Sequence, residues 1–315
     1  MASPYFPPTN KVIGTDVGET IVATPQNDDV YAGDGNDYIV GGPGSDYIDG
    51  GPGFDIAAFD GPSTRYQVVV TGGVATVTDT SDGSVDHLVN VNRLDFADQQ
   101  LTVNLPAFSP IRYIASNPDL LVVYRDNASE GAWHYAEHGY AEGRQTASFN
   151  GLTYIASNPD LIPWLGASAN DGTYHYIYHG FEEGRGPGNF DGLGYIASYD
   201  DLIPWLGVNW EAGATHYIQH GFSEGRSAGT FNGLEYIASY PDLIDWLGAD
   251  YGRGTAHFVE HGFYEGRVRD NFNAVQYLNN YADLKAWLGD NYDAATAHYI
   301  EHGYHEGRTD HAIIA

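Results

Sequence analysis

Residues 14–58 decide the fold of this chain. They read GTDVGETIV, ATPQNDDVY, AGDGNDYIV, GGPGSDYID and GGPGFDIAA, in successive blocks of nine. From the second block onward the sixth position is aspartate and the eighth is aliphatic: Asp28, Asp37, Asp46 and Asp55, then Val30, Ile39, Ile48 and Ala57. The last three blocks add glycine at positions two and four: Gly33, Gly35, Gly42, Gly44, Gly51 and Gly53. Because the aspartates, the aliphatic residues and the glycines share one period of nine, we predict one structural unit per block.

The spacing within a block predicts a tight turn that binds a cation. Glycine adopts backbone angles that other residues resist, so the turn can curl until its carbonyl oxygens point inward. One carboxylate per turn joins those carbonyls, at Asp28, Asp37, Asp46 and Asp55, with Asp34 as a candidate extra ligand. Oxygen ligands at adaptable distances suit Ca²⁺ better than zinc or copper. We therefore expect calcium, and an aliphatic core formed by the eighth positions. The alternative is a flexible Gly/Asp-rich linker, but a linker would not place an aliphatic residue at the same position of every block.

This pattern resembles the RTX (repeats-in-toxin) family, whose nonad G-G-x-G-x-D-x-U-x builds a calcium-binding β-roll. The resemblance implies that each ion lies between turns two nonads apart. Nonad two would pair with four and three with five, and a weaker site would join one and three. Nonad one departs from the pattern, with Glu19 in place of aspartate and Val17 in place of glycine. Type I secretion is usual in the family, so the resemblance also implies an extracellular or bacterial cell-surface location. The tail, residues 309–315, is a candidate secretion signal.

The composition excludes several partners. The 315 residues carry 42 acidic and 13 basic side chains, a formal net charge of −29. Such a surface repels nucleic acid and anionic lipid and attracts divalent cations. Cysteine is absent, and no apolar run approaches membrane-spanning length. We expect no nucleic-acid partner and no membrane span.

Residues 59–106 change to a period of two. YQVVV and VATVTD flank Thr71-Gly72-Gly73, which predicts a hairpin. The phrase L-x-N-V-x-R-L-x-F-A-D at residues 88–98 resembles the β-cap that follows the roll in serralysin-type modules. Three aspartates here, Asp82, Asp86 and Asp98, are interpreted as solvated turn residues in preference to a further calcium site.

Residues 107–308 hold five copies of a 41-residue repeat. The consensus is F-N-G-L-x-Y-I-A-S-x-P-D-L-I-P-W-L-G, a variable stretch, then H-Y-I-x-H-G-F-x-E-G-R. Apolar spacing and the prolines predict short helices, stacked in a solenoid-like array because no copy could bury its aromatics alone. We expect Gly180 to end the third helix of its copy. We also expect the P-D-L aspartate and E-G-R arginine to pair and lock one copy to its neighbour.

The predicted fold class is therefore α+β and multidomain. It comprises an N-terminal parallel β-roll with an antiparallel β-cap, and a C-terminal α-helical repeat region. The predicted boundaries are 1–13 for an extended lead-in, 14–58 for the roll, 59–106 for the cap, 107–308 for the repeats and 309–315 for the tail.

Ten histidines occupy two positions of the repeat, at i and i+4. Both rings then lie on one helix face, the spacing that zinc helices use, and a glutamate follows four residues later. A structural role is favoured, because histidine in the last turn of a helix can bond its final carbonyls. A pH sensor is a further alternative. The alternative second metal set is His175, His179, His216, His220, His257 and His261.

Motifs for catalysis are scarce. The sequence has no H-E-x-x-H, no G-x-S-x-G and no phosphate loop. Five copies of one residue set indicate architecture, since an active site is normally built once. We expect a secreted calcium-binding protein, not an enzyme, with a structural, surface-layer, matrix or adhesive role, which self-associates in extracellular calcium. One alternative is binding of a cell-surface polysaccharide through exposed tyrosine and tryptophan of the repeats. Another is the non-catalytic part of a secreted hydrolase.

Overall fold

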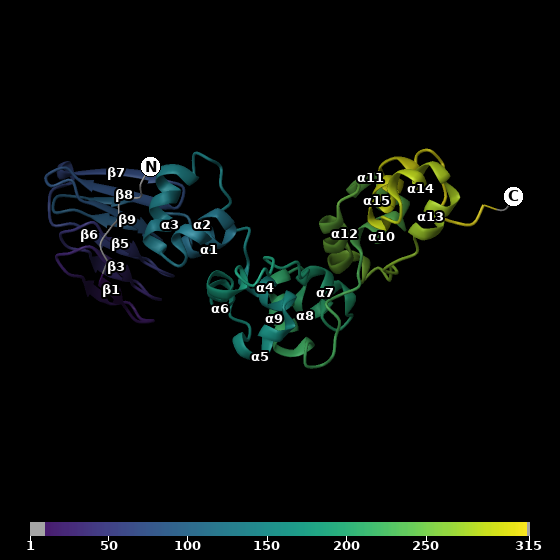
Figure 1. Ribbon diagram of the computed structural model, residues 1–315, viewed down its shortest axis with the longest axis horizontal. Coiled ribbons are helices and arrows are strands. Elements are labelled where there is room, and N and C mark those ends of the chain that lie inside the picture. Colours follow the sequence, from purple (N-terminus) through teal and green to yellow (C-terminus); the bar gives the residue numbers. More distant parts are fainter. Residues whose placement is uncertain (1–9, 314–315) are drawn as a thin grey trace. The chain divides into compact units, whose positions relative to one another are not determined.

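The computed structural model describes residues 10–313 (Figure 1). Strands occupy the N-terminal part and short helices the rest, so the α+β class predicted from the sequence is confirmed. The chain forms two compact units. The first holds the residues up to 150 together with 173–184, and the second holds 151–172 and the residues from 185 onward.

The strands of the nonads, and the strand β1 that precedes them, alternate between two parallel sheets. One sheet contains β1 (Asn10–Ile13), β3 (Asp28–Tyr31) and β5 (Tyr47–Asp49), and the other contains β2 (Thr20–Val22), β4 (Tyr38–Val40) and β6 (Ile56–Ala58). Each strand pairs with the strand two nonads away, so Val30 lies opposite Ile48 and Ile39 opposite Ala57. These eighth-position side chains are buried in the core between the sheets. One nonad is thus one strand plus one turn.

The cap extends both sheets of the roll. After η1 (Ser63–Arg65), strands β7 (Tyr66–Thr71) and β8 (Val74–Asp79) form the predicted hairpin. Strand β9 (Val85–Val89) returns antiparallel to β8 and lies parallel to β5. Strand β10 (Arg93–Asp95) lies parallel to β6, and β11 (Gln100–Thr102) pairs antiparallel to β10. Each parallel sheet therefore gains one more parallel strand, and the roll's last strands are not left as open edges.

Each 41-residue copy consists of three short helices. The first helices are α1 (Pro110–Ser116), α4 (Gly151–Ser157), α7 (Gly192–Ser198), α10 (Gly233–Ala238) and α13 (Ala274–Asn280). The second are α2 (Pro118–Tyr124), η3 (Pro159–Leu161) with α5 (Ile162–Leu165), α8 (Ile203–Leu206), α11 (Pro241–Leu247) and α14 (Ala282–Leu288). The third are α3 (Ala128–His134), α6 (Ala169–His175), α9 (Trp210–His216), α12 (Tyr251–His257) and α15 (Tyr292–His298). A π-helical turn follows each third helix: η2 (Tyr135–Gly139), η4 (Tyr176–Gly180), η5 (Tyr217–Gly221), η6 (Phe258–Gly262) and η7 (Tyr299–Gly303).

The helical segment of the third helix, including its π-helical turn, ends at Gly180, as predicted from the sequence. The chain continues in turns to Gly184, which has a φ of +72°. At Gly221, which matches Gly180 one copy later, a Cβ atom would lie 2.2 Å from the Tyr195 hydroxyl oxygen. Glycine at this repeat position therefore serves a close approach, and the glycine of E-G-R supplies the left-handed turn. Sequence alone does not separate these two uses of glycine.

A buried tyrosine joins the first and third helices of a copy. Tyr195 is fully buried, and its hydroxyl is hydrogen-bonded to Nδ1 of His216 at 2.9 Å. The same bond recurs at Tyr113–His134 (2.8 Å), Tyr236–His257 (2.9 Å) and Tyr277–His298 (2.9 Å). The first histidine of these pairs thus has the structural role favoured from the sequence.

The repeated arginine pairs with the repeated aspartate, but within one copy. Both terminal nitrogens of Arg226 bond Asp201, at 3.0 and 2.8 Å, and its Nε bonds Glu224 at 2.6 Å. The guanidinium also lies 4.9 Å from the ring centre of Tyr199. The predicted pairing is therefore present, whereas the prediction that it locks one copy to its neighbour is wrong. Consecutive copies of the second unit interlock instead through helices: α4 packs on α9, α7 on α12 and α10 on α15.

We predict that Gly221→Ala destabilises the repeats. The added methyl group would overlap the Tyr195 hydroxyl and disturb its bond to His216, at a cost of about 1–3 kcal/mol. Thermal unfolding followed at 222 nm should show a lower Tm. Gly186→Ala is the matched control, because a Cβ there would meet no atom within 4 Å. Equal melting temperatures for the two variants would contradict the close-approach constraint.

We also predict that acid weakens the helical repeats. Burial, followed by the nearby arginine, lowers the pKa of His216 and of His257 below the usual 6.5. The unfolded chain then binds more protons than the folded chain, so stability is complete above pH 6.5 and falls as the pH drops below it. Melting curves at pH 7 and pH 5 measure the effect. His216→Gln should reduce the difference, whereas His220→Gln, at an exposed ring, should preserve it.

Candidate metal site

The turns of the roll stack directly on one another, two nonads apart. A Cβ at Gly33 would lie 2.1 Å from the carbonyl oxygen of Thr15, and one at Gly51 would lie 2.1 Å from that of Gly33. Both glycines have positive φ angles, +96° and +79°. A second stack places Gly42 over Thr24, whose carbonyl oxygen lies 2.7 Å from the Cβ position. This is the pairing of turns that the resemblance implies, and it leaves space only for glycine.

One oxygen of Asp37, Asp46 and Asp55 accepts a main-chain N–H of the turn two nonads earlier. Asp46 Oδ1 accepts the main-chain N–H of Asp28 at 3.0 Å, and Asp55 Oδ1 accepts that of Asp37 at 2.9 Å. Asp37 Oδ1 likewise accepts the N–H of Glu19 at 2.8 Å. Each bond spans 18 residues, which is two nonads. The aspartates therefore form ladders along the roll.

The second oxygen of three of these aspartates is buried without a hydrogen-bond partner among the described residues. These atoms are Oδ2 of Asp37, Asp46 and Asp55. Burial raises the pKa of Asp46 to about 7 and that of Asp55 to about 6. A buried carboxylate oxygen left unpaired costs free energy, which a bound cation offsets. Unpaired carboxylate oxygens beside stacked carbonyls fit calcium, which is held by oxygen alone.

Asp28 differs from the other three because a threonine of its own turn donates hydrogen bonds to its carboxylate. The Thr24 N–H and hydroxyl donate to Asp28 Oδ2 at 2.9 and 2.8 Å. Thr24 stands where the last three nonads have their first turn glycine. Nonad one repeats the arrangement, with the Thr15 hydroxyl bonded to Glu19 at 2.8 Å. We therefore propose Asp37, Asp46 and Asp55 as the principal calcium ligands and Asp28 as a weaker one.

The structure gives less support to Asp34 as an extra calcium ligand and to the histidines as a second metal site. Asp34 is exposed on its turn. The two rings of each pair lie close together but tilted, with centroids 5.4 Å apart for His175–His179, His216–His220 and His257–His261. Nδ1 of His216 already bonds Tyr195, and Glu224 bonds Arg226. Within residues 10–313 no three His, Asp or Glu side chains are grouped as a metal site. Metal binding by the histidines stays a prediction.

The sequence interpretation is wrong for one of the three aspartates of the cap. Asp82 and Asp98 are exposed, and they accept hydrogen bonds from the N–H groups of Ser84 and Ser63. Asp86 is instead buried, and its Oδ1 accepts the N–H of Asp46 at 2.8 Å. The interpretation as a solvated turn residue is wrong for Asp86. It lies 40 residues after Asp46, so the nine-residue period could not reveal it.

Comparison with known proteins agrees with this geometry. The profile of the RTX calcium-binding nonapeptide repeat matches residues 14–57 in four copies. This segment is therefore an RTX β-roll segment and its ion is calcium, as predicted. RTX repeats are typical of secreted calcium-binding proteins, and the repeat is a calcium-binding motif, not a catalytic one.

Other comparisons add little to this assignment. Among solved structures, the extracellular lipase LipA from Serratia marcescens is similar at 19% identity with a TM-score of 0.28. The similarity covers 32% of this chain and 20% of the lipase chain, so this chain spans about a fifth of the lipase's length. No curated protein matches. In the described part of the chain, no helix has both the length and the apolar character needed to cross a membrane.

We predict that Asp37→Ala removes ligation at its calcium ion. The substitution deletes a buried unpaired oxygen, so isothermal titration calorimetry should show fewer ions bound or weaker binding. Asp119→Ala is the control, because that carboxylate is exposed and bonds Arg144 far along the sequence from the roll. Calcium binding unchanged in Asp37→Ala would rule out the assignment.

Proposed function

We propose that this chain is a secreted, non-enzymatic protein whose roll folds on calcium outside the cell and whose helical repeats then serve assembly or adhesion. The observation that carries the proposal is the set of buried, unpaired oxygens on Asp37, Asp46 and Asp55. Without calcium these charges oppose the folded roll, and with calcium they hold its turns together.

The energetics suit an extracellular trigger. Extracellular calcium modules bind with Kd values of about 10⁻⁴–10⁻³ M. At a tenfold excess of calcium over Kd, each ion adds about 1.4 kcal/mol. Two or three ions then contribute about 3–4 kcal/mol, a large part of a typical net stability of about 5–15 kcal/mol. The same roll would remain loose in a cytosol poor in calcium.

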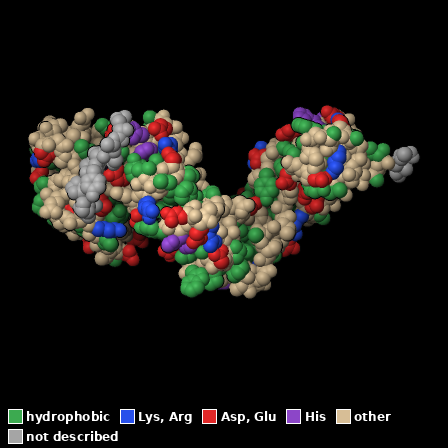
Figure 2. Space-filling view, viewed as in Figure 1, with side chains coloured by type: hydrophobic (Ala, Val, Ile, Leu, Met, Phe, Trp, Pro, Cys, Tyr) green, Lys and Arg blue, Asp and Glu red, His purple; other side chains and the backbone are tan. Residues whose placement is uncertain are grey.

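The charge of the surface supports calcium-dependent assembly. Acidic side chains are spread over the face seen in Figure 2, with basic patches between them. The repeated aspartates, such as Asp201 and Asp242, stay about 60% exposed although they pair with arginine. A chain with a net charge of −29 associates with its own copies only if cations neutralise part of that charge. Calcium bridging between exposed carboxylates would supply this in a surface layer or matrix.

Exposed tryptophans favour polysaccharide binding as a second candidate. One tryptophan in each of the last four copies is largely exposed: Trp164 at 85%, Trp205 at 68%, Trp246 at 59% and Trp287 at 72%. An indole usually buries its apolar area, so repeated exposure at one position suggests a partner. Trp205 packs edge-on over His216, with ring centres 5.6 Å apart, which fixes the ring for stacking. A sugar ring presents an apolar face of matching size.

We predict calcium-dependent folding and assembly of the intact protein. Far-UV circular dichroism should show more structure and a higher Tm in millimolar calcium than in EGTA. Negative-stain microscopy should show ordered assemblies in calcium that disperse in EGTA. Identical spectra and melting points in both buffers would refute the role of calcium.

The same preparations separate the two candidates for the repeats. Monodisperse particles in calcium that bind a neutral polysaccharide on a glycan array would refute assembly and support the second candidate. A variant with Trp164, Trp205, Trp246 and Trp287 changed to alanine should then lose glycan binding. Because these rings are exposed, the variant should keep the wild-type melting temperature.

A further inference from the structure

Strand β7 is the least protected edge of the two sheets. It is the last strand of its sheet and is six residues long (Figure 1). The other edge strands are protected in ways that proteins commonly use: β2 and β11 have only three residues each, and β1 contains Lys11. β7 reads YQVVVT, without a charged residue or a proline. A long, uncharged edge of this kind is a ready template for a further strand.

Alternate residues of β7 have main-chain groups that β8 does not use. In a hairpin with a two-residue turn, the residues that flank the turn form a hydrogen-bonded pair, and such pairs then alternate along the strands. The flanking residues here are Thr71 and Val74. The residues whose N–H and C=O groups point away from β8 are therefore Tyr66, Val68 and Val70. Among the described residues, no strand pairs with this side of β7.

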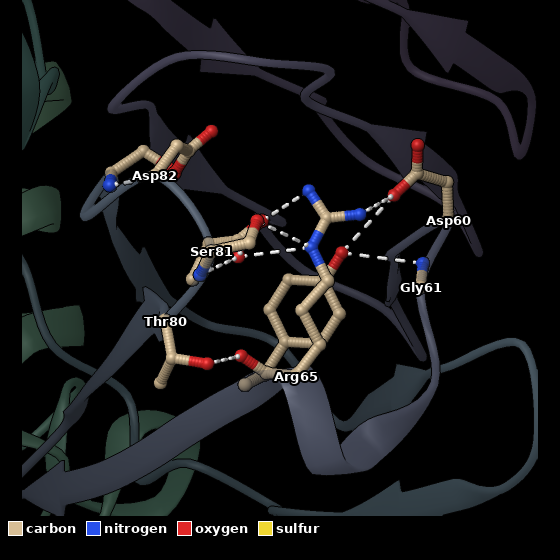
Figure 3. Close-up of polar contacts among 9 residues, drawn as sticks. Asp60, Gly61, Arg65, Thr80, Ser81 and Asp82 are labelled. Carbon is tan, nitrogen blue, oxygen red and sulfur yellow. Dashed lines mark hydrogen bonds and ion pairs between the residues drawn. The ribbon is translucent and has the colours of Figure 1, made fainter.

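Contacts at both ends hold this edge in place. At the start of β7, the hydroxyl and the N–H of Thr80 donate to the carbonyl oxygen of Arg65 at 2.7 and 2.9 Å (Figure 3). At the other end, the turn lies against an aromatic ring, because a Cβ at Gly72 would lie 2.7 Å from the ring of Tyr135. A strand that is already ordered loses little conformational freedom when it pairs with a partner.

The charged residues next to this edge neutralise one another within the copy. Arg65 donates to Asp60 at 3.2 Å and to Asp79 at 2.9 Å (Figure 3). From there the whole hairpin, residues 66–78, contains no Asp, Glu, Lys or Arg. A chain with a net charge of −29 repels its own copies over most of its surface. A neutral edge is therefore a place where two copies can approach without bringing carboxylates together.

We propose that β7 pairs antiparallel with β7 of a second copy of this chain, so that two copies share one continuous sheet. A twofold axis at Val68 places Val68 opposite its equivalent and Tyr66 opposite Val70 of the second copy, so the outward main-chain groups bond one another. Tyr66 and Val68 pack on the core, so this register also joins core side to core side. The contact is self-complementary. It rests on the assembly part of the proposed function and names an interface for it.

A lysine on this edge tests the pairing in the full chain. Val69 is 49% exposed, so Val69→Lys should keep the fold while placing at the contact a charge that calcium cannot bridge. Sedimentation velocity in millimolar calcium should show dimers of the unsubstituted chain. In Val69→Lys we expect the dimer dissociation constant to rise by about tenfold or more. Val69→Thr is the matched control, because threonine keeps the shape and strand preference of valine without a charge.

A cysteine at the twofold axis gives a second readout that does not depend on breaking the contact. The chain has no cysteine of its own. Opposite residues of a hydrogen-bonded pair have Cα atoms about 5.5 Å apart, which a disulfide can span. Val68→Cys should therefore form a covalent dimer when a mild thiol oxidant is added in calcium. Thr78→Cys is the control, because it lies on β8 and the β7 strands of both copies would separate it from its equivalent.

The results separate this interface from assembly in general. Weaker dimers in Val69→Lys together with a covalent dimer in Val68→Cys would support the pairing. Assemblies that Val69→Lys leaves intact, with no covalent dimer in Val68→Cys, would overturn the pairing while assembly through another surface stands. An unsubstituted chain that stays monomeric in calcium would overturn both the pairing and the assembly part of the proposed function.

Discussion

Unpaired negative charge inside the roll is the constraint on which the N-terminal structure depends. Stacked glycine turns bring carbonyl oxygens and carboxylates close together, with Gly51 against the Gly33 carbonyl and Asp55 bonded to the next turn. The hydrogen-bond ladder uses only one oxygen of each carboxylate, so geometry alone does not neutralise the other. A chain that builds such turns must bind a cation or protonate its aspartates. The narrow core of eighth-position aliphatics adds apolar burial but does not remove this charge.

In the helical repeats, the repeated polar side chains bond one another: Tyr195 bonds His216, and Arg226 bonds Asp201 and Glu224. Exposed ion pairs of this kind contribute about 0–1 kcal/mol each, and the packing of buried tyrosines and of helices between copies must supply most of the stability. The two regions thus respond differently to their surroundings. We expect calcium to stabilise the roll, whereas these contacts of the repeats involve protein groups alone.

The sequence predicted the periodic parts of this structure well. A period of nine with Asp and Gly at fixed places gave the roll, and alternation from Tyr66 gave the β7–β8 hairpin. The features that the sequence did not predict depend on contacts between residues that no repeat relates. Asp86 joins the ladder because β9 lies parallel to β5, a pairing across 40 residues that a nine-residue pattern cannot signal. Gly221 and Gly225 look alike in sequence, yet one makes room for a tyrosine hydroxyl and the other supplies a left-handed turn.

Protons and calcium compete for the same oxygens of the roll. The pKa of Asp46 is raised to about 7 and that of Asp55 to about 6, so the calcium-free folded roll holds protons that the unfolded chain has released. Its stability without calcium is therefore greatest in acid and falls as the pH rises through these values. Calcium reverses the trend, because it binds the ionised carboxylates and replaces the lost protons. Near neutral pH we therefore expect the roll to depend on the ion, in line with the proposed folding outside the cell.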